Sequence, residues 1–395
     1  MREAWTAVGF LWFAFALNYL DRQMIFSMFP LLRRELALTD AELGLVGTVF
    51  LWVYSLSMPL AGRVADRMPA HRLVLASLTL WSLATFGTGL SRNLGELLVW
   101  RAALGVSEAL YYPAAVGLLA HVHSNATRSK ALAAHQSAQY LGAVAGGWYG
   151  GWAAEYLGLR AGFGWAALVG LVLAGLLGRW LPRPRRQAPA ALNGRPLWRN
   201  LGHPGYLALA LAFFVLCVML WMFYAWLPTL LYERFQLSMT DTGLIASGYL
   251  QVGAVAGVLL GGVWGDRAAR DNPQARLILA AAGLLGAAPC AFWSLSETAL
   301  GGAKLLVLGF GAASGVMVAN VFSAIYDLVP AQSYSLAVGL INMLGGISGG
   351  AAVLLAGHAK ADWGIDTLMR SAAVAAVVAG SLLAWVYRSY CRRSV

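Results

Sequence analysis

The chain has 395 residues, of which 59% are hydrophobic and only 11% are charged, whereas a soluble globular domain is nearer a quarter charged. This composition argues against an ordinary water-soluble enzyme. The net charge is +11, but the basic residues lie in short clusters between apolar stretches, which removes the usual support for nucleic-acid binding. Three scattered cysteines are too few for a disulfide framework or a thiolate metal site.

Crossing the hydrocarbon core of a membrane takes about 20 mostly apolar residues as a helix. The chain offers twelve such stretches, separated by short polar breaks, and none alternates polar with apolar residues as barrel strands do. The sequence therefore predicts an all-α membrane protein with twelve transmembrane helices. The expected spans are 5–29, 43–62, 73–91, 94–120, 131–154, 161–181, 205–232, 243–265, 276–296, 303–328, 336–358 and 366–388.

The orientation of the spans follows from the distribution of lysine and arginine. Most of these residues fall on one side once both termini and the even-numbered loops are placed together. Cytoplasmic loops carry such an excess. We therefore expect an inner or plasma membrane protein with both termini in the cytoplasm.

A polar, proline-rich stretch divides the chain into two halves. Residues 182–204 are predicted to form a cytoplasmic linker between an N-terminal six-helix bundle, 1–181, and a C-terminal six-helix bundle, 205–395. The segment Gly62–Arg67 (GRVADR) recurs as Gly262–Arg267 (GVWGDR), each after the second span of its half. Such a repeat predicts two pseudo-symmetric bundles that arose by duplication.

Four ionisable side chains lie deep inside predicted spans, Asp21 and Arg22 in the first and Arg101 and Glu108 in the fourth. Each costs about 2.5 kcal/mol or more in the membrane, so such residues tend to border an aqueous cavity. The spacing of Arg101 and Glu108 puts both on one helix face, about 10 Å apart along the axis. The alternative is a buried ion-pair network that only joins helices.

The chemistry of these residue types suggests a division of roles. The planar guanidinium of an arginine suits a carboxylate, so Arg22 and Arg101 are candidates for binding an anionic substrate. A carboxyl group shielded from water can exchange a proton near neutral pH, so Asp21 and Glu108 are candidates for proton coupling. Neutral polar side chains that could complete the site are Tyr19, Tyr54, Gln139, Tyr224, Asn320, Ser323 and Asn342.

Two Asp-Arg pairs lie at cytoplasmic span ends, Asp66-Arg67 and Asp266-Arg267. They could simply cap helices, or they could bridge neighbouring helices in one conformation and act as gates. His135, near the cytoplasmic end of its span, is expected to contact headgroups or water. No histidines and carboxylates have metal-ligand spacing and no phosphate-binding loop appears, so we expect no metal, cofactor, catalysis or ATP hydrolysis.

With these motifs the sequence resembles the major facilitator superfamily over essentially its whole length. The runs NYLDR at 18–22, LTDAELGLVGTVFLWVYSL at 38–56, RAALGVSEA at 101–109 and GLINMLGG at 339–346 are similar to those of the anion:cation symporter family. That resemblance implies uptake of sugar acids and other carboxylates with protons or sodium. It implies Asp21 and Glu108 as proton carriers, Arg22 and Arg101 at the substrate carboxylate, and polar contacts from Tyr19, Tyr54, Gln139 and Asn342.

Two departures and two alternatives accompany this resemblance. The basic run that usually follows the first Asp-Arg turn is replaced by Met68 to Arg72, and Ser107 stands where glycine usually precedes the glutamate. Similar patterns also occur in spinster-type transporters of lysolipids or sphingoid bases, and a non-transporting receptor would keep the same fold. The expected partners are a small organic anion, protons or sodium, and membrane lipids, without nucleic acid, for a monomer.

Overall fold

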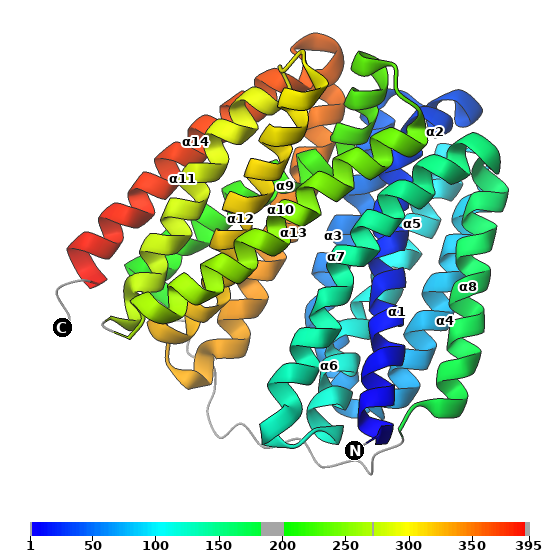
Figure 1. Cartoon of the computed structure of the whole chain (residues 1–395). Helices are drawn as coiled ribbons and strands as arrows, with labels where there is room; N and C mark the ends of the chain where they lie inside the picture. Colours follow the sequence, from blue (N-terminus) through cyan, green and yellow to red (C-terminus); the bar gives the residue numbers. More distant parts are fainter. Residues whose placement is uncertain (1, 183–200, 271, 392–395) are drawn as a thin grey trace. The chain divides into compact units, whose positions relative to one another are not determined.

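The computed structural model describes residues 2–182, 201–270 and 272–391, and these ranges are helical with no β-strand (Figure 1). Residues 183–200, most of the predicted linker, lie outside the described residues. The predicted all-α fold class is confirmed.

The chain forms two compact units. Unit 1 contains the first eight helices together with the segment Leu231–Leu244. Its helices are α1 (Arg2–Ser27), α2 (Phe29–Leu36), α3 (Asp40–Arg67), α4 (Ala70–Leu90), α5 (Leu94–Ala109), α6 (Tyr111–Val122), α7 (Asn125–Tyr156) and α8 (Gly158–Trp180).

Unit 2 contains the rest of α9 (Pro204–Phe235) and of α10 (Met239–Ala268) together with all later helices. These are α11 (Arg276–Ser294), α12 (Leu300–Leu328), α13 (Tyr334–Asp362) and α14 (Ile365–Val386), with the short elements η2 (Pro273–Ala275), η3 (Ala331–Ser333) and η4 (Tyr387–Cys391). The division of the chain at residues 181 and 205 stays a prediction. The contacts add that Leu231–Leu244, on the C-terminal side of the linker, packs with unit 1.

Ten helices in the described ranges are long and apolar enough to cross a membrane, with α5 and α6 counted as one span. Helices α1 and α7, of 26 and 32 residues, are also long enough, and with them the total agrees with the twelve predicted spans. Large apolar side chains such as Phe13, Val99, Leu259 and Leu305 are more than 60% exposed. This exposed apolar surface fits a lipid environment.

Glycines allow close helix packing in both units. A Cβ atom on Gly142, Gly146 or Gly150 of α7 would lie within 2.6 Å of a backbone oxygen of α1. In unit 2, a Cβ on Gly257 of α10 would lie 1.9 Å from the carbonyl oxygen of Ala312 in α12. Backbones of neighbouring helices therefore touch directly at these positions, as small residues permit in membranes.

The span that carries Arg101 and Glu108 is interrupted. Helix α5 ends at Ala109 and α6 begins at Tyr111, with Pro113 in the first turn of α6. Proline has no N–H to continue the hydrogen-bond ladder of the preceding turn. Ser77 of α4 donates its hydroxyl to the carbonyl oxygen of Ser107, 2.6 Å away. Glu108 thus lies in the last turn of α5, directly before the break.

Candidate functional site

Unit 1 brings the four predicted charges into one buried cluster. Arg22 of α1 donates its Nε–H to Oε2 of Glu108 on α5 at 2.6 Å. Glu108 and Asp21 are 1% and 2% exposed, Arg22 is 8% exposed and Arg101 has no exposed surface. In the described conformation, the cluster is therefore an internal network of two cations and two carboxylates.

Aromatic faces surround the guanidinium of Arg22. Its central carbon lies 4.2 Å from the ring centre of Tyr54, 5.0 Å from that of Tyr19 and 5.4 Å from that of Phe50. Cations are attracted to such ring faces. Tyr19 and Tyr54 were both predicted as site residues and both are half-buried. The rings hold Arg22 in place and leave it slightly accessible, in contrast to Arg101.

Arg101 lies deeper, with its guanidinium carbon 4.6 Å from the ring centre of Phe50. It is close enough to Asp21 and Glu108 to interact electrostatically with both. Asp21 accepts a 3.3 Å hydrogen bond from the hydroxyl of Thr85 on α4. The second arginine therefore offsets carboxylate charge inside the unit, because an unpaired buried charge would be costly.

Several polar atoms of this cluster make no hydrogen bond with any described residue. They are Oδ1 of Asp21, Oε1 of Glu108, Nε and Nη2 of Arg101, and both amide atoms of Asn18. Buried polar groups normally have partners, so these atoms are available to a water molecule or a substrate, and the two carboxylate oxygens are also available to a proton. Sequence reasoning missed Asn18, which is 1% exposed, and Thr85, although the polar run around Asp21 gave a signal for Asn18.

Two further predictions concern α7. Gln139 is half-buried in unit 1. The expectation for His135 is wrong: its side chain is fully buried and stacks on Phe15 with ring centres 4.5 Å apart. Its Nε2 atom lies 3.2 Å from the hydroxyl of Tyr111, which donates its proton to the carbonyl of Leu11. His135 therefore donates Nε2–H to Tyr111, a packing role that the spacing alone could not reveal.

The predicted site residues of the C-terminal half lie in unit 2 and are described separately. Tyr224 of α9 accepts a 3.0 Å hydrogen bond from the amide of Gln251. The amide of Asn320 donates to the carbonyls of Gly261 and Val316, which is a helix-packing contact. Ser323 is half-buried, and Asn342 is exposed and donates to the carbonyl of Val338.

The two Asp-Arg pairs lie at helix ends, as predicted, and the second has an unexpected partner. Arg276, at the start of α11, donates to Asp266 at 3.1 Å and to Asp327 at 2.9 Å. This bridge joins the ends of α10, α11 and α12. Arg267, the neighbour of Asp266 in the sequence, makes no ion pair with a described residue. Asp66 and Arg67 are exposed at the end of α3.

Metal binding finds no support in the part of the chain that the structure describes. No group of three or more histidine, cysteine or acidic side chains there is placed to hold a metal ion.

Comparison with known proteins identifies the family. The sequence profile of the Major Facilitator Superfamily matches residues 11–353. This chain belongs to the Major Facilitator Superfamily. Together with the helical fold and the apolar spans, this membership makes it an integral membrane protein.

Relatives of this major facilitator protein include a spinster homolog, an efflux pump and a probable sugar-acid transporter. Protein spinster homolog 1 of Bos taurus is 29% identical over 313 residues, 71% of this chain and 58% of the relative, so the chain spans less than two thirds of that relative. The probable L-galactonate transporter of Escherichia coli K12 is 25% identical over 338 residues, 78% of this chain and 74% of the relative.

A solved structure has the same fold. The crystal structure of a bacterial homolog to the human lysosomal transporter Spinster, in an inward-facing and unoccupied conformation, matches with a TM-score of 0.84. The sequences are 18% identical, and the match covers 99% of this chain and 98% of that one. At this identity, the likeness defines the major facilitator fold and leaves the substrate open.

Proposed function

We propose that this protein is a transporter that takes up a small organic anion, such as a sugar acid, together with a proton by alternating access. The protein would lie in an inner or plasma membrane, with both termini in the cytoplasm. The observation that carries the proposal is the 2.6 Å contact between Arg22 and Glu108. A substrate carboxylate and the carboxylate of Glu108 would compete for the same guanidinium.

This competition couples the anion to a proton. While Glu108 is ionised, it occupies the Nε–H of Arg22. A proton bound by Glu108 removes its charge, so that the guanidinium can accept a substrate carboxylate instead. The network keeps the same net charge, because one anion and one proton enter together. When the anion leaves on the other side, Glu108 loses its proton and pairs with Arg22 again.

The remaining residues of unit 1 have supporting roles in this proposal. Asp21 is the second proton carrier, since its free Oδ1 lies in the same cluster. Arg101 is fully buried, so we assign it first to balancing Asp21 and Glu108 and only then to the substrate. Tyr19, Tyr54 and Gln139 are the candidates for hydrogen bonds to the hydroxyl groups of the substrate.

Further candidates for contacts with the substrate lie in unit 2. The candidates there are Tyr224, Ser323 and Asn342, whose side chains are half-buried or exposed. Asn320 is a weaker candidate because its amide hydrogens are bonded within unit 2.

Uptake by sealed proteoliposomes tests the proposal. An inward proton gradient should drive accumulation of a radiolabelled hexonate or hexuronate, and a protonophore should abolish it. An inward sodium gradient tests the other coupling ion. Arg22→Ala should eliminate anion uptake, whereas Arg22→Lys, which keeps the charge and loses the planar donor pair, should retain part of it. Gradient-independent uptake would overturn proton coupling.

A lipid substrate is the second candidate. The rings of Tyr19, Phe50 and Tyr54 around Arg22 would also suit an amphipathic molecule, and a spinster homolog is among the relatives. Transfer of a fluorescent lysophospholipid between leaflets, without carboxylate uptake, would support this candidate. Neither activity in folded protein would favour a receptor.

A further inference from the structure

A pocket of about 450 Å³ lies in unit 1, away from the cluster around Arg22. It is formed by the end of α2, the turn between α4 and α5, and the turn between α7 and α8. These elements meet at the end of the unit opposite to the start of α1 (Figure 1). The charged residues that line the pocket are Glu35 of α2, Arg92 of the α4–α5 turn and Arg160 of α8. The pocket thus combines two cations with one carboxylate.

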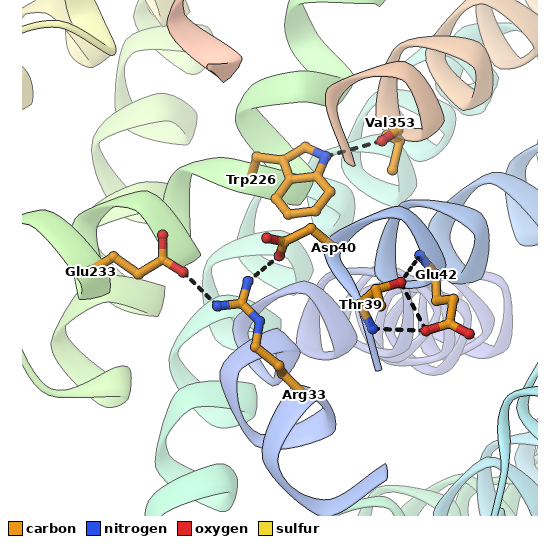
Figure 2. A network of polar contacts seen from close by, with 7 residues as sticks. All are labelled: Arg33, Thr39, Asp40, Glu42, Trp226, Glu233 and Val353. Atoms are coloured by element: carbon orange, nitrogen blue, oxygen red, sulfur yellow. Dashed lines mark hydrogen bonds and ion pairs between the residues drawn. The ribbon is translucent and has the colours of Figure 1, made fainter. Parts of the chain in front are cut away.

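Glu35 has no countercharge among the described residues. It is exposed and forms no ion pair with any of them. Arg33, two residues earlier, is already engaged, because it donates to Glu233 at 2.8 Å and to Asp40 (Figure 2). A Cβ atom on Gly158 would lie 3.8 Å from Oε1 of Glu35. The carboxylate of Glu35 therefore lies across the pocket, close to the first residue of α8.

The two arginines of the pocket, Arg92 and Arg160, are exposed and also form no ion pair with a described residue. Glu96, four residues after Arg92, accepts the backbone N–H of Arg92 at 2.9 Å and the side-chain amide of Asn93 at 3.1 Å. Glu96 thus holds the turn through these two groups and makes no salt bridge with the guanidinium of Arg92.

Helix stability does not explain two of these three charges. Glu35 lies in the last turn of α2, and Arg160 lies in the first turn of α8. The helix dipole favours the opposite arrangement, with carboxylates near the start of a helix and cations near its end. A ligand that pairs with charges of both signs accounts for both positions.

A phosphoethanolamine group complements all three charges. Its phosphodiester oxygens are acceptors for the two guanidiniums, which bind phosphate through paired N–H groups. Its primary ammonium donates hydrogen bonds to a carboxylate. A phosphate group alone leaves Glu35 unpaired, and the quaternary ammonium of choline has no N–H to donate. The volume of the pocket lies within the range of about 300–1,000 Å³ that is usual for small-molecule sites.

The surface beside the pocket is apolar and belongs to two membrane spans, α4 and α8. These helices touch at this end, since a Cβ atom on Gly89 would lie 2.7 Å from Cβ of Phe163. Phe86 and Leu90 of α4 and Trp165 of α8 are 47%, 48% and 56% exposed. Tryptophan is frequent at the level of lipid headgroups. A phospholipid can therefore place its headgroup in the pocket and its acyl chains along α4 and α8.

We propose that this pocket binds the phosphoethanolamine headgroup of a membrane phospholipid. Arg92 and Arg160 donate to the phosphate, Glu35 accepts from the ammonium, and the acyl chains lie along α4 and α8. The site is separate from the cluster around Arg22, so it depends neither on transport nor on the transported molecule.

Native mass spectrometry of the full-length protein in detergent tests the headgroup. The protein is titrated with dioleoyl phospholipids that carry ethanolamine, glycerol or choline. One molecule of phosphatidylethanolamine should bind with an apparent dissociation constant about three- to fivefold lower than that of the other two lipids, because Glu35 adds an exposed ion pair for this headgroup alone. Equal dissociation constants for the three lipids would overturn the proposal.

Charge-removing variants assign the partners within the headgroup. Glu35→Gln should abolish the preference for phosphatidylethanolamine over phosphatidylglycerol without weakening the binding of phosphatidylglycerol. Arg92→Gln combined with Arg160→Gln should weaken all three lipids about tenfold, because two charge-assisted contacts with the phosphate are lost. Unfolding temperatures should stay close to that of the wild type, since substitutions at exposed positions change stability little.

Arg179→Gln is the matched control, because Arg179 is an exposed arginine in the last turn of α8 that forms no ion pair with a described residue. It should leave the binding of all three lipids unchanged. Weakening by Arg179→Gln as large as that of the double variant would indicate a general attraction of lipids to cations and would overturn the proposal. So would an unchanged lipid preference in Glu35→Gln.

Competition distinguishes a lipid from a soluble ligand with the same headgroup chemistry. Glycerophosphoethanolamine carries the same phosphodiester and ammonium but has no acyl chains. It should displace phosphatidylethanolamine only at about a hundredfold higher concentration, because burial of acyl methylene groups adds to the affinity of the lipid. Displacement at equal concentrations would show that the pocket takes a soluble phosphodiester, and would overturn the assignment to a membrane phospholipid.

Discussion

Arg22 and Glu108 join α1 to the last turn of α5 through one 2.6 Å hydrogen bond between a guanidinium and a carboxyl group. Oε1 of the same carboxylate makes no hydrogen bond with a described residue. Glu108 thus uses one oxygen to hold Arg22 and has the other available for a proton. This asymmetry fits a residue that titrates during transport better than a carboxylate that only pins two helices.

Glu108→Gln should separate exchange from accumulation. The neutral amide resembles protonated Glu108, so Arg22 stays available to the substrate and no proton is carried. We expect counterflow exchange of labelled anion at a rate within about threefold of the wild type, with accumulation driven by a pH gradient reduced at least tenfold, since the coupling free energy is lost. Both are measured in the same proteoliposomes.

The control for this variant is Asp362→Asn, which neutralises an exposed acid at the end of α13. It should leave accumulation intact. Concentrative uptake by Glu108→Gln would mean that the coupling proton is carried elsewhere.

Arg101→Met should destabilise the protein more than it alters substrate selection. Arg101 is fully buried beside Asp21 and Glu108, and removing one partner of a buried ionic network costs about 3–5 kcal/mol. Thermal unfolding in detergent should therefore occur at a clearly lower temperature. Adding Asp21→Asn should recover part of the loss, because it removes the carboxylate left without its countercharge.

Arg160→Met is the reference for this measurement, since Arg160 is exposed and forms no ion pair with a described residue. An Arg101→Met protein as stable as Arg160→Met would indicate that water, and not the arginine, balances the carboxylates.

Gly257→Ala should destabilise unit 2, although alanine is the better helix former by up to about 1 kcal/mol. The added methyl group would meet the Ala312 carbonyl at 1.9 Å, and separating the two backbones costs about 1–3 kcal/mol. Gly262→Ala on the same helix meets nothing within 4 Å and should be neutral or stabilising. Thermal unfolding of the two variants compares the gain in helix propensity with the cost of the backbone clash. Equal unfolding temperatures would contradict close packing of Gly257 against Ala312.

Arg276→Ala should loosen the ends of α10 and α12. It leaves Asp266 and Asp327 without the guanidinium that joins them, at a cost of about 0.2–1 kcal/mol for such partly exposed pairs. Faster hydrogen exchange in peptides that contain either aspartate is the expected result. Arg267→Ala should have no such effect, and a larger effect of Arg267→Ala than of Arg276→Ala would contradict the bridge through Arg276.

Helix positions could be predicted from hydropathy, because each membrane span is a long run of apolar residues that can be recognised without knowledge of the tertiary structure. The predicted span 276–296 and the observed α11, Arg276–Ser294, nearly coincide. The predicted span 94–120 gave no indication of the break at Leu110 between α5 and α6. Pro113 alone does not reveal it, since many membrane helices tolerate proline.

The membership of the charged cluster was predictable only in part. Asp21, Arg22, Arg101 and Glu108 stand out in the sequence because they lie in apolar spans, and the structure places all four in one cluster. Thr85 was invisible because a threonine in a membrane helix usually bonds its own backbone. The pairing of Asp266 with Arg276 depends on how helix ends meet, and His135 is buried by the rings of Phe15 and Tyr111. Neither fact is encoded in local spacing.

The glycine contacts of α7 with α1 limit how Arg22 can change its surroundings. The α7 glycines face backbone atoms of Ala16, Leu20 and Met24. If one helix slid along the other, the carbonyl oxygens of these α1 residues would collide with the larger residues of α7 that lie between the glycines. We therefore expect the two helices to move together as one rigid body during the transport cycle. Relocation of the Arg22 guanidinium is then left to rotation of its own side chain or to displacement of α3 and α5, which carry Tyr54 and Glu108.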